Sequence, residues 1–411
     1  MTSFPSKIQL PNLQPGLIQR PRLTDSLMAG QNKKLTLISA ATGFGKTTLA
    51  ITWAQKSGYP VAWLALEDLD NDLARFFTYL IRAIQTVQDE FGAALIDKLQ
   101  TIRPGDLSDE PGTLVEALIA EIARFSRDIL LILDDYHCIT NSKIQASLRF
   151  LMSNQPANLH LALVSRADPP WPLGRLRANR ELSEIRTADL RFTTAEAAEF
   201  LNRQMGLDLT SGQVLALERQ TEGWIAGLQL AALSLQGQEN PQAVITSLAG
   251  SHRFIADYLI EEVLEKQPPE IQEFLLQTAI LEPLNAALCD AVTGRTDSQS
   301  VLWQLERANL FLQPLDQERQ WYRYHHLFAD LLKVKLSQQF PGRIGELQRR
   351  ACHWHDRQGN QLEALRYALD AGDAPLAERL LAGNIFRLLN NAEAGAALHR
   401  LESIPRGPHD D

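Results

Sequence analysis

The chain has 411 residues, 45% of them apolar, and a formal net charge of −9, so its length suggests about two or three domains. The acidic balance and the absence of a Lys- or Arg-rich run predict that this polypeptide does not hold DNA by itself. No apolar run approaches the ~20 residues of a membrane span and the first residues lack an apolar signal core, so no membrane association and a cytoplasmic location are expected.

The most informative element is a predicted phosphate-binding loop near the N-terminus. Residues 40–48 read AATGFGKTT and follow a short apolar run, residues 34–40, that is typical of a buried parallel strand. Residues 47–56 show helical spacing and stop before Gly58 and Pro60, so a helix is expected directly after the loop. Glycines allow consecutive N–H groups to point inward, and the helix N-terminus adds partial positive charge. This pattern predicts an anion cradle for a nucleoside triphosphate.

The loop supplies most of the candidate nucleotide contacts, which are Thr42, Gly43, Phe44, Gly45, Lys46, Thr47 and Thr48. Lys46 can reach the outer phosphates, and the Thr47 hydroxyl is placed to ligate a magnesium ion. Ala40 stands where the motif G-x-x-x-x-G-K-[ST] has glycine, and its methyl is expected to tighten the loop without removing a donor. A chance glycine-rich turn is the alternative, and the flanking strand and helix argue against it.

Further apolar runs predict more strands of the same sheet, at residues 60–66, 128–135 and 159–165. The second run ends in two carboxylates, so we expect Asp134 to be an outer-sphere magnesium ligand and Asp135 a water-orienting acid. The third is followed by Arg166, which can sense or stabilise a terminal phosphate. A surface arginine paired with an acid would give the same pattern. Asp134, Asp135 and Arg166 are therefore the candidate catalytic residues.

Downstream of residue 190 the chain is predicted to be mainly helical. Thr193 with Glu196 and Thr210 with Gln213 match capping boxes, residues 224–235 read as a buried helix, and helices around a short hairpin with its turn at 316–319 suggest a winged helix. From Gly342 on, alanine- and leucine-rich helical pairs are typical of a solenoid. The predicted organisation is a P-loop nucleotide-binding domain over 1–190, a helical subdomain over 191–262, a winged-helix domain over 263–340 and a helical arm over 341–405.

A structural metal is not expected. The three cysteines are far apart and include no C-x-x-C pair, which predicts neither a disulfide framework nor a zinc site. Two histidine groupings, Cys352 with His355 and His325 with His326, fall short of the four ligands that structural zinc needs.

Five segments, in order along the chain, resemble the ATPase half of MalT-type regulators, which are LuxR-family activators in the STAND class of signal-transduction ATPases. The segments read GFGKTT, LILDDYH, SRADPPWPLGRLRA, TEGWIAGLQLAAL and WYRYHHLFADLL, and the resemblance runs from about Leu13 to at least Leu381. It implies an α/β P-loop NTPase fold, a parallel sheet with helices on both faces, followed by helical, winged-helix and all-α repeat-like domains.

The resemblance also implies a switch. In such proteins ADP is held in the resting state, an inducer on a downstream repeat domain promotes exchange for ATP, and the protein multimerises. On this basis Lys46 and Thr47 hold phosphates and Mg²⁺, Asp134 holds the metal, and Arg166 is the phosphate sensor. His325 resembles a winged-helix histidine that contacts the ADP β-phosphate, with a capping or core histidine as the alternative.

Two further positions follow from the resemblance alone. Arg20, in the segment IQRPRL, matches an adenine-side leader and joins the candidate cofactor contacts. Gln229 stands where related switch ATPases often carry proline, which puts the nucleotide contact of the helical subdomain in doubt.

The expected function is a slow regulatory ATPase, with copurifying ADP and turnover below the common enzyme range of ~1–1000 per second. A conventional P-loop enzyme, either a small-molecule kinase or a motor-type ATPase, and a helical interaction scaffold with a vestigial nucleotide site are the alternatives. Full members continue into a repeat sensor and a LuxR helix-turn-helix, whereas this sequence ends at Asp411. We therefore expect either a fragment or a natural short form with a separate partner, reaching DNA only through a LuxR-type domain outside the chain.

Overall fold

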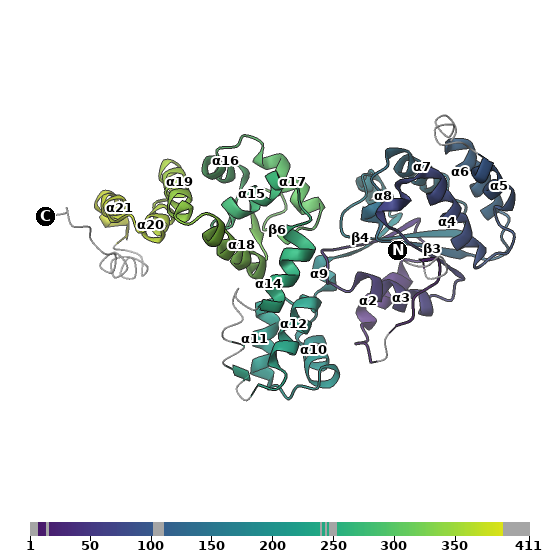
Figure 1. The fold of residues 1–411 in the computed structure, drawn as a ribbon, viewed down its shortest axis with the longest axis horizontal. Coiled ribbons are helices and arrows are strands. Elements are labelled where there is room, and N and C mark those ends of the chain that lie inside the picture. Colours follow the sequence, from purple (N-terminus) through teal and green to yellow (C-terminus); the bar gives the residue numbers. More distant parts are fainter. Residues whose placement is uncertain are drawn as a thin grey trace. The chain divides into compact units, whose positions relative to one another are not determined.

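The computed structural model describes residues 7–13, 16–101, 111–238, 241–242, 245 and 253–388. The chain divides into two compact units (Figure 1). The first unit comprises residues 1–237 together with the short segment Arg307–Asn309, and the second comprises residues 238–306 and 310–411.

The first unit is built on a five-stranded parallel sheet with the strand order β2-β3-β4-β1-β5. The strands are β1 (Leu35–Ser39), β2 (Val61–Ala65), β3 (Ile129–Asp134), β4 (Leu159–Ser165) and β5 (Leu182–Arg186). Every residue of β1, β3 and β4 is buried, as expected for central parallel strands covered on both faces. The four strands that the apolar runs predict are confirmed to within one residue at each end. Strand β5 was not predicted, because its sequence LSEIR is not a continuous apolar run.

Helices cover both faces of this sheet, with α2 and α3 on one side and α4 to α8 on the other (Figure 1). They are α2 (Pro21–Ala29), α3 (Lys46–Lys56), α4 (Leu73–Gln85), α5 (Ala93–Thr101), α6 (Pro111–Ile122), α7 (Ser142–Ser153) and α8 (Leu173–Ala178). On the α4 side, alternate strand residues including Leu37 and Leu131 join Phe76 of α4 in one core. On the other side, Trp53 of α3 meets His160 of β4 edge-on, with ring centroids 5.8 Å apart. The predicted α/β fold class is thus confirmed.

The first unit also contains a set of short helices after β5. These are α9 (Thr187–Leu190), α10 (Thr194–Ala198), a π-helical segment (Glu199–Gln204), α11 (Ser211–Thr221) and α12 (Ile225–Leu235). Both predicted capping boxes are confirmed, since the Thr193 hydroxyl accepts the N–H of Glu196 and the Thr210 hydroxyl accepts the N–H of Gln213. Each side chain satisfies a backbone donor that the first helical turn leaves without an intrahelical partner.

The second unit is mainly helical around a two-stranded antiparallel ladder. Its elements are α14 (Arg253–Leu259), a π-helical segment (Ile260–Leu264), α15 (Pro269–Thr278), α16 (Ala286–Thr293), α17 (Ser298–Arg307), β6 (Leu312–Pro314), β7 (Tyr322–Tyr324), α18 (His326–Gln339), α19 (Arg343–Arg357), α20 (Gln361–Asp370) and α21 (Ala374–Leu388). Leu312 pairs with Tyr324 and Pro314 with Tyr322, which gives the short hairpin that the sequence predicts. Helix α19 packs on α20, and α20 packs on α21. Within the described ranges, no helix is both long enough and apolar enough to cross a bilayer.

The central strand of the sheet provides a stability test. Leu131 is fully buried in the middle of β3, between β2 and β4. Leu131→Ala should lower the free energy of unfolding by about 2–5 kcal/mol, because it removes buried methyl groups and leaves a cavity. The matched control is Leu69→Ala, at a position 51% exposed, which should change stability by about 0.5 kcal/mol or less. Chemical denaturation measures both variants, and equal losses would contradict the assignment of this core.

Candidate functional site

Residues 40–45 form the turn between β1 and α3, at the carboxyl edge of the sheet where β3 and β4 also end. Gly43 and Gly45 have φ values of 76° and 74°, a region that favours glycine because a Cβ atom is disfavoured there. Ala40 is outside this left-handed region and fully buried, and its N–H donates to the carbonyl of Ser165 at 3.3 Å. Alanine therefore fits at the motif's first glycine position.

Lys46 opens helix α3 and is buried, with 7% of its surface exposed. Its Nζ donates to the carbonyl of Ala41 at 2.8 Å, so the side chain curls back over the loop. Burial, followed by the positive charge of Arg166, lowers the pKa of Lys46 to about 8. A buried ammonium beside a second cation is costly unless an anion is added, so the cradle is electrostatically suited to phosphate.

Thr47 and Asp134 meet across the end of the sheet. The Thr47 hydroxyl donates to Asp134 Oδ1 at 3.1 Å, and the backbone N–H of Asp135 donates to the same oxygen at 3.0 Å. Asp134 is buried, and this burial, followed by the charge of Asp135, raises the pKa of its carboxyl to about 7. A hydroxyl and a buried carboxylate are hard oxygen donors of the kind that Mg²⁺ prefers, so the pair fits the cation that the sequence predicts.

Asp135 and Arg166 follow strands β3 and β4 directly. Asp135 adopts a left-handed backbone conformation with φ 53°, which is strained for a residue with a Cβ atom. Its Oδ1 lies 3.8 Å from Nδ1 of His137, whose pKa is lowered by burial to about 4, so this histidine is neutral at physiological pH. Arg166 is near enough to Lys46 for its charge to affect that pKa, which places both cations beside the loop.

A cavity of ≈ 490 Å³ adjoins the phosphate loop. Gly45, Thr48 and Arg20 from the predicted set line it. The apolar part of the lining comes from residues that the sequence did not single out, among them Leu17, Ile18, Phe192, Phe200, Met205 and Ile225. A hollow that combines apolar side chains with hydrogen-bonding groups is typical of a small-molecule site, and it suits a base and ribose. Gln229 also lines the cavity and offers an amide group to it.

Arg20 is buried at the edge of this cavity and is held by the protein itself. Its guanidinium donates to the carbonyls of Leu190 and Arg191 at 2.7 and 3.0 Å and pairs with Glu196 at 3.4 Å. It also lies over the ring of Phe192, 5.0 Å from the centroid. Arg20 thus ties the leader to the start of the helical segment and shapes the cavity wall. A direct contact between Arg20 and nucleotide stays a prediction.

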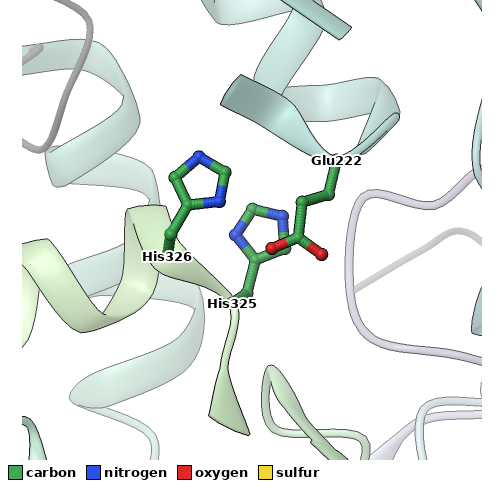
Figure 2. A group of neighbouring side chains, drawn as sticks. All are labelled: Glu222, His325 and His326. Carbon is green, nitrogen blue, oxygen red and sulfur yellow. The ribbon is translucent and has the colours of Figure 1, made fainter. Parts of the chain in front are cut away.

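His325 belongs to the second unit, where it precedes α18 and is buried. Its N–H donates to the carbonyl of Phe311 at 2.7 Å, and its ring stacks on that of His326 with centroids 5.0 Å apart (Figure 2). The remaining residue drawn in Figure 2, Glu222, is the C-cap that follows α11 in the first unit, where it pairs with Arg191 at 2.9 Å. Contact of His325 with a β-phosphate stays a prediction from the resemblance.

The other grouping, Cys352 with His355, lies on α19. His355 stacks on Tyr367 of α20 with centroids 5.4 Å apart, and burial lowers the pKa of this histidine. Cys352 is fully buried, and its burial raises the pKa of the thiol to about 11. Both side chains pack in the α19–α20 interface.

Asp134 gives a test through pH and magnesium. Because its carboxyl binds a proton near pH 7, Mg²⁺ must displace that proton, and the gain in ADP affinity that Mg²⁺ provides should grow as pH rises from about 6 to about 8. Asp134→Asn should remove both the gain and its pH dependence. Calorimetric titration with ADP, with and without Mg²⁺, measures this. Asp128→Asn, at an exposed position just before β3, is the control and should behave like the wild type.

The same shift predicts a stability change in the protein without ligands. The folded-state pKa of Asp134 lies above its ordinary value of 3.8, so the folded protein retains a proton that the unfolded chain releases. Stability should therefore fall as pH rises from about 4 to about 7, and Asp134→Asn should lessen that fall. A variant with the wild-type pH profile in both assays would show that Asp134 does not titrate in this way.

The chain is similar to several known proteins. The family described as the MalT winged helix domain matches residues 260–344. The serine/threonine-protein kinase PknK of Mycobacterium tuberculosis is 37% identical over 393 residues, which cover 95% of this chain and 35% of that protein. The HTH-type transcriptional regulator MalT of Klebsiella pneumoniae is 34% identical over 406 residues, covering 98% of this chain and 44% of that protein.

Among solved structures, a Walker-type ATPase of Pyrococcus abyssi matches with a TM-score of 0.52 at 14% identity, covering 79% of this chain and 100% of that one. This likeness shows the fold alone. The chain spans less than half the length of the two curated relatives, which are similar to it along nearly its whole sequence. This chain therefore contains a MalT winged-helix domain, carries a phosphate loop on a parallel sheet and is similar to MalT along nearly its whole length.

Proposed function

We propose that this chain is the nucleotide switch of a MalT-like transcriptional regulator, in which exchange of ADP for ATP and slow hydrolysis control multimerisation. The observation that carries the proposal is the composite site of the first unit. A buried Lys46 and the Thr47–Asp134 pair lie beside a cavity of about 490 Å³ that Gly45 and Thr48 help to line and whose wall is partly apolar. Phosphates, a divalent cation and a nucleoside each have a place suited to their chemistry.

The chain's own residues have distinct roles in this proposal. Lys46 and the loop N–H groups bind phosphate oxygens, and Thr47 and Asp134 hold Mg²⁺, which supplies charge neutralisation on the phosphates when bound. Asp135 orients the attacking water, and Arg166 stabilises charge on the terminal phosphate. The partly exposed Asp135 side chain, 47% accessible, is compatible with water access.

The two curated relatives support the role of a nucleotide switch more than that of the kinase or DNA-binding part itself. One is named a protein kinase and the other a transcriptional regulator, yet both are similar to this chain along almost all of its length. The shared region covers 35% of the first and 44% of the second, so the named activities need not reside in it. A nucleotide-controlled module is the function that both could use. DNA binding and inducer sensing then belong to a LuxR-type domain and to a downstream sensor or partner.

The decisive experiment identifies the bound nucleotide. Mass spectrometry of the small molecules released from freshly purified protein should find ADP. Turnover should be below about 1 per second, since a switch must hold each state longer than a metabolic enzyme does. Rapid turnover would favour a conventional P-loop enzyme. Failure of the wild type to bind ADP or ATP would favour a scaffold with a vestigial site.

Lys46 provides the matched variant. Lys46→Ala should weaken ADP binding roughly 10- to 100-fold, because it removes a charge-assisted hydrogen bond to phosphate in a buried cradle. Lys56→Ala removes the same charge from the other end of α3, where the side chain is exposed, and should leave affinity unchanged. Calorimetry measures both. Equal affinities in the two variants would refute the cradle.

His325 tests the resting state. If His325 contacts the ADP β-phosphate, as the resemblance implies, His325→Ala should speed ADP release and increase self-association. Its stacked neighbour His326 serves as the control position, and His326→Ala should have the smaller effect. Stopped-flow release of a fluorescent ADP analogue and light scattering measure the two properties. An unchanged ADP off-rate in His325→Ala would remove this histidine from the mechanism.

A further inference from the structure

Two hydrogen bonds join the phosphate loop to the start of helix α12. The indole Nε1 of Trp224 donates to the carbonyl of Thr42 at 3.0 Å, and the backbone N–H of Ala226 donates to the carbonyl of Gly43 at 3.0 Å. These residues are about 180 positions apart in the sequence and lie in the same unit. Trp224 is fully buried, so water does not compete for its hydrogen bond.

The loop approaches α12 too closely for any residue larger than glycine at position 43. A Cβ atom added to Gly43 would lie 2.6 Å from the Cβ of Ala226 and 2.7 Å from Nε1 of Trp224. A Cβ atom on Gly227 would lie 2.4 Å from Cε3 of Trp224. The Trp224 ring thus lies against two glycines, one on the loop and one on α12. Gly43 must lack a side chain for the loop to approach the indole this closely, and Gly227 must lack one for the ring to pack on α12.

Peptide geometry turns this packing into an effect on anion binding. A trans peptide is planar, so its carbonyl and its N–H point in opposite directions. When the carbonyl of Thr42 faces Trp224, the N–H of Gly43 faces away from α12. When the carbonyl of Gly43 faces Ala226, the N–H of Phe44 does the same. Two consecutive loop amides are therefore oriented together, as a phosphate-binding nest requires.

Resting on the proposed function, we propose that Trp224, together with the N–H of Ala226, is a positioning group that preorganises the phosphate loop. Glycine at position 43 has unusual backbone freedom, so without a fixed carbonyl partner the 42–43 peptide can rotate and turn its N–H out of the nest. The indole hydrogen bond removes that freedom before the ligand arrives. Because binding linkage is reciprocal, phosphate in the nest also tightens the attachment of α12 to the loop.

The test separates the donor from the bulk of the side chain. Trp224→Phe keeps an aromatic ring but loses the N–H, and should weaken ADP binding roughly three- to tenfold while leaving adenosine binding unchanged. Trp63→Phe is the matched control, because Trp63 is also fully buried and its Nε1 has no hydrogen-bond partner within the described residues. Calorimetry with ADP and with adenosine measures both variants.

Loss of ADP affinity alone in Trp224→Phe supports the proposal. Equal losses for ADP and adenosine would show a general packing role, and unchanged ADP affinity would show that the hydrogen bond is dispensable, so either result overturns the proposal. If the wild type binds neither ligand, the proposed function fails before Trp224 is tested.

A second measurement uses the wild type and does not depend on whether the variant folds. By reciprocity, saturation with ADP should slow hydrogen exchange at the Ala226 amide, whereas adenosine should not. The amide of Val214, which bonds to the carbonyl of Thr210 within α11, is the internal reference and should change little with either ligand. Exchange at Ala226 that is the same with ADP as with adenosine would overturn the proposal.

Discussion

The site depends on charges that are buried before any ligand is present. Lys46 and Asp134 are almost completely buried, and the pKa of each is moved toward neutrality, to about 8 and about 7. Desolvation is the largest cause of both pKa shifts, so the charged forms of these two side chains are unfavourable at the end of the sheet. An anion beside Lys46 and a cation beside Asp134 relieve that cost together. Nucleotide with magnesium brings both charges at once, so binding of this ligand should stabilise the folded site.

The position of the loop explains why these groups can be buried at all. It follows β1, which lies between β4 and β5, and all five residues of β1 are buried. On its outer side the loop meets Trp224 and Ala226, so backbone and side chains enclose it from two directions. Arg20 extends this enclosure through its bonds to the carbonyls of residues 190 and 191. The leader, the sheet and the helical segment thus build one site in the first unit.

Sequence patterns predicted the parts of this site whose signal is local. Continuous apolar runs marked four strands, and the spacing of Gly43, Gly45 and Lys46 marked the loop. Strand β5 was not predicted because Ser183 and Glu184 interrupt its run of apolar residues. The sequence predicts only that Trp224 belongs to a buried helix, because nothing in it shows that the indole bonds to a residue 182 positions away. The cavity lining was not predicted either, because its residues come from segments far apart in the sequence: the leader, residues 192–205 and α12.

Arg166 is hydrogen-bonded to a short segment, residues 307–309, that packs with the first unit although its neighbours in the sequence belong to the second. Residues 307–309 belong to the first unit, while the residues before and after them belong to the second. Within the first unit, Nδ2 of Asn309 donates to the carbonyl of Arg166 at 2.9 Å and to the Ser39 hydroxyl at 3.1 Å. Asn309 itself has φ 49°, so this turn is held in a strained conformation by its partners. In the proposed switch, a shift of the Arg166 turn on loss of a terminal phosphate would act directly on Asn309.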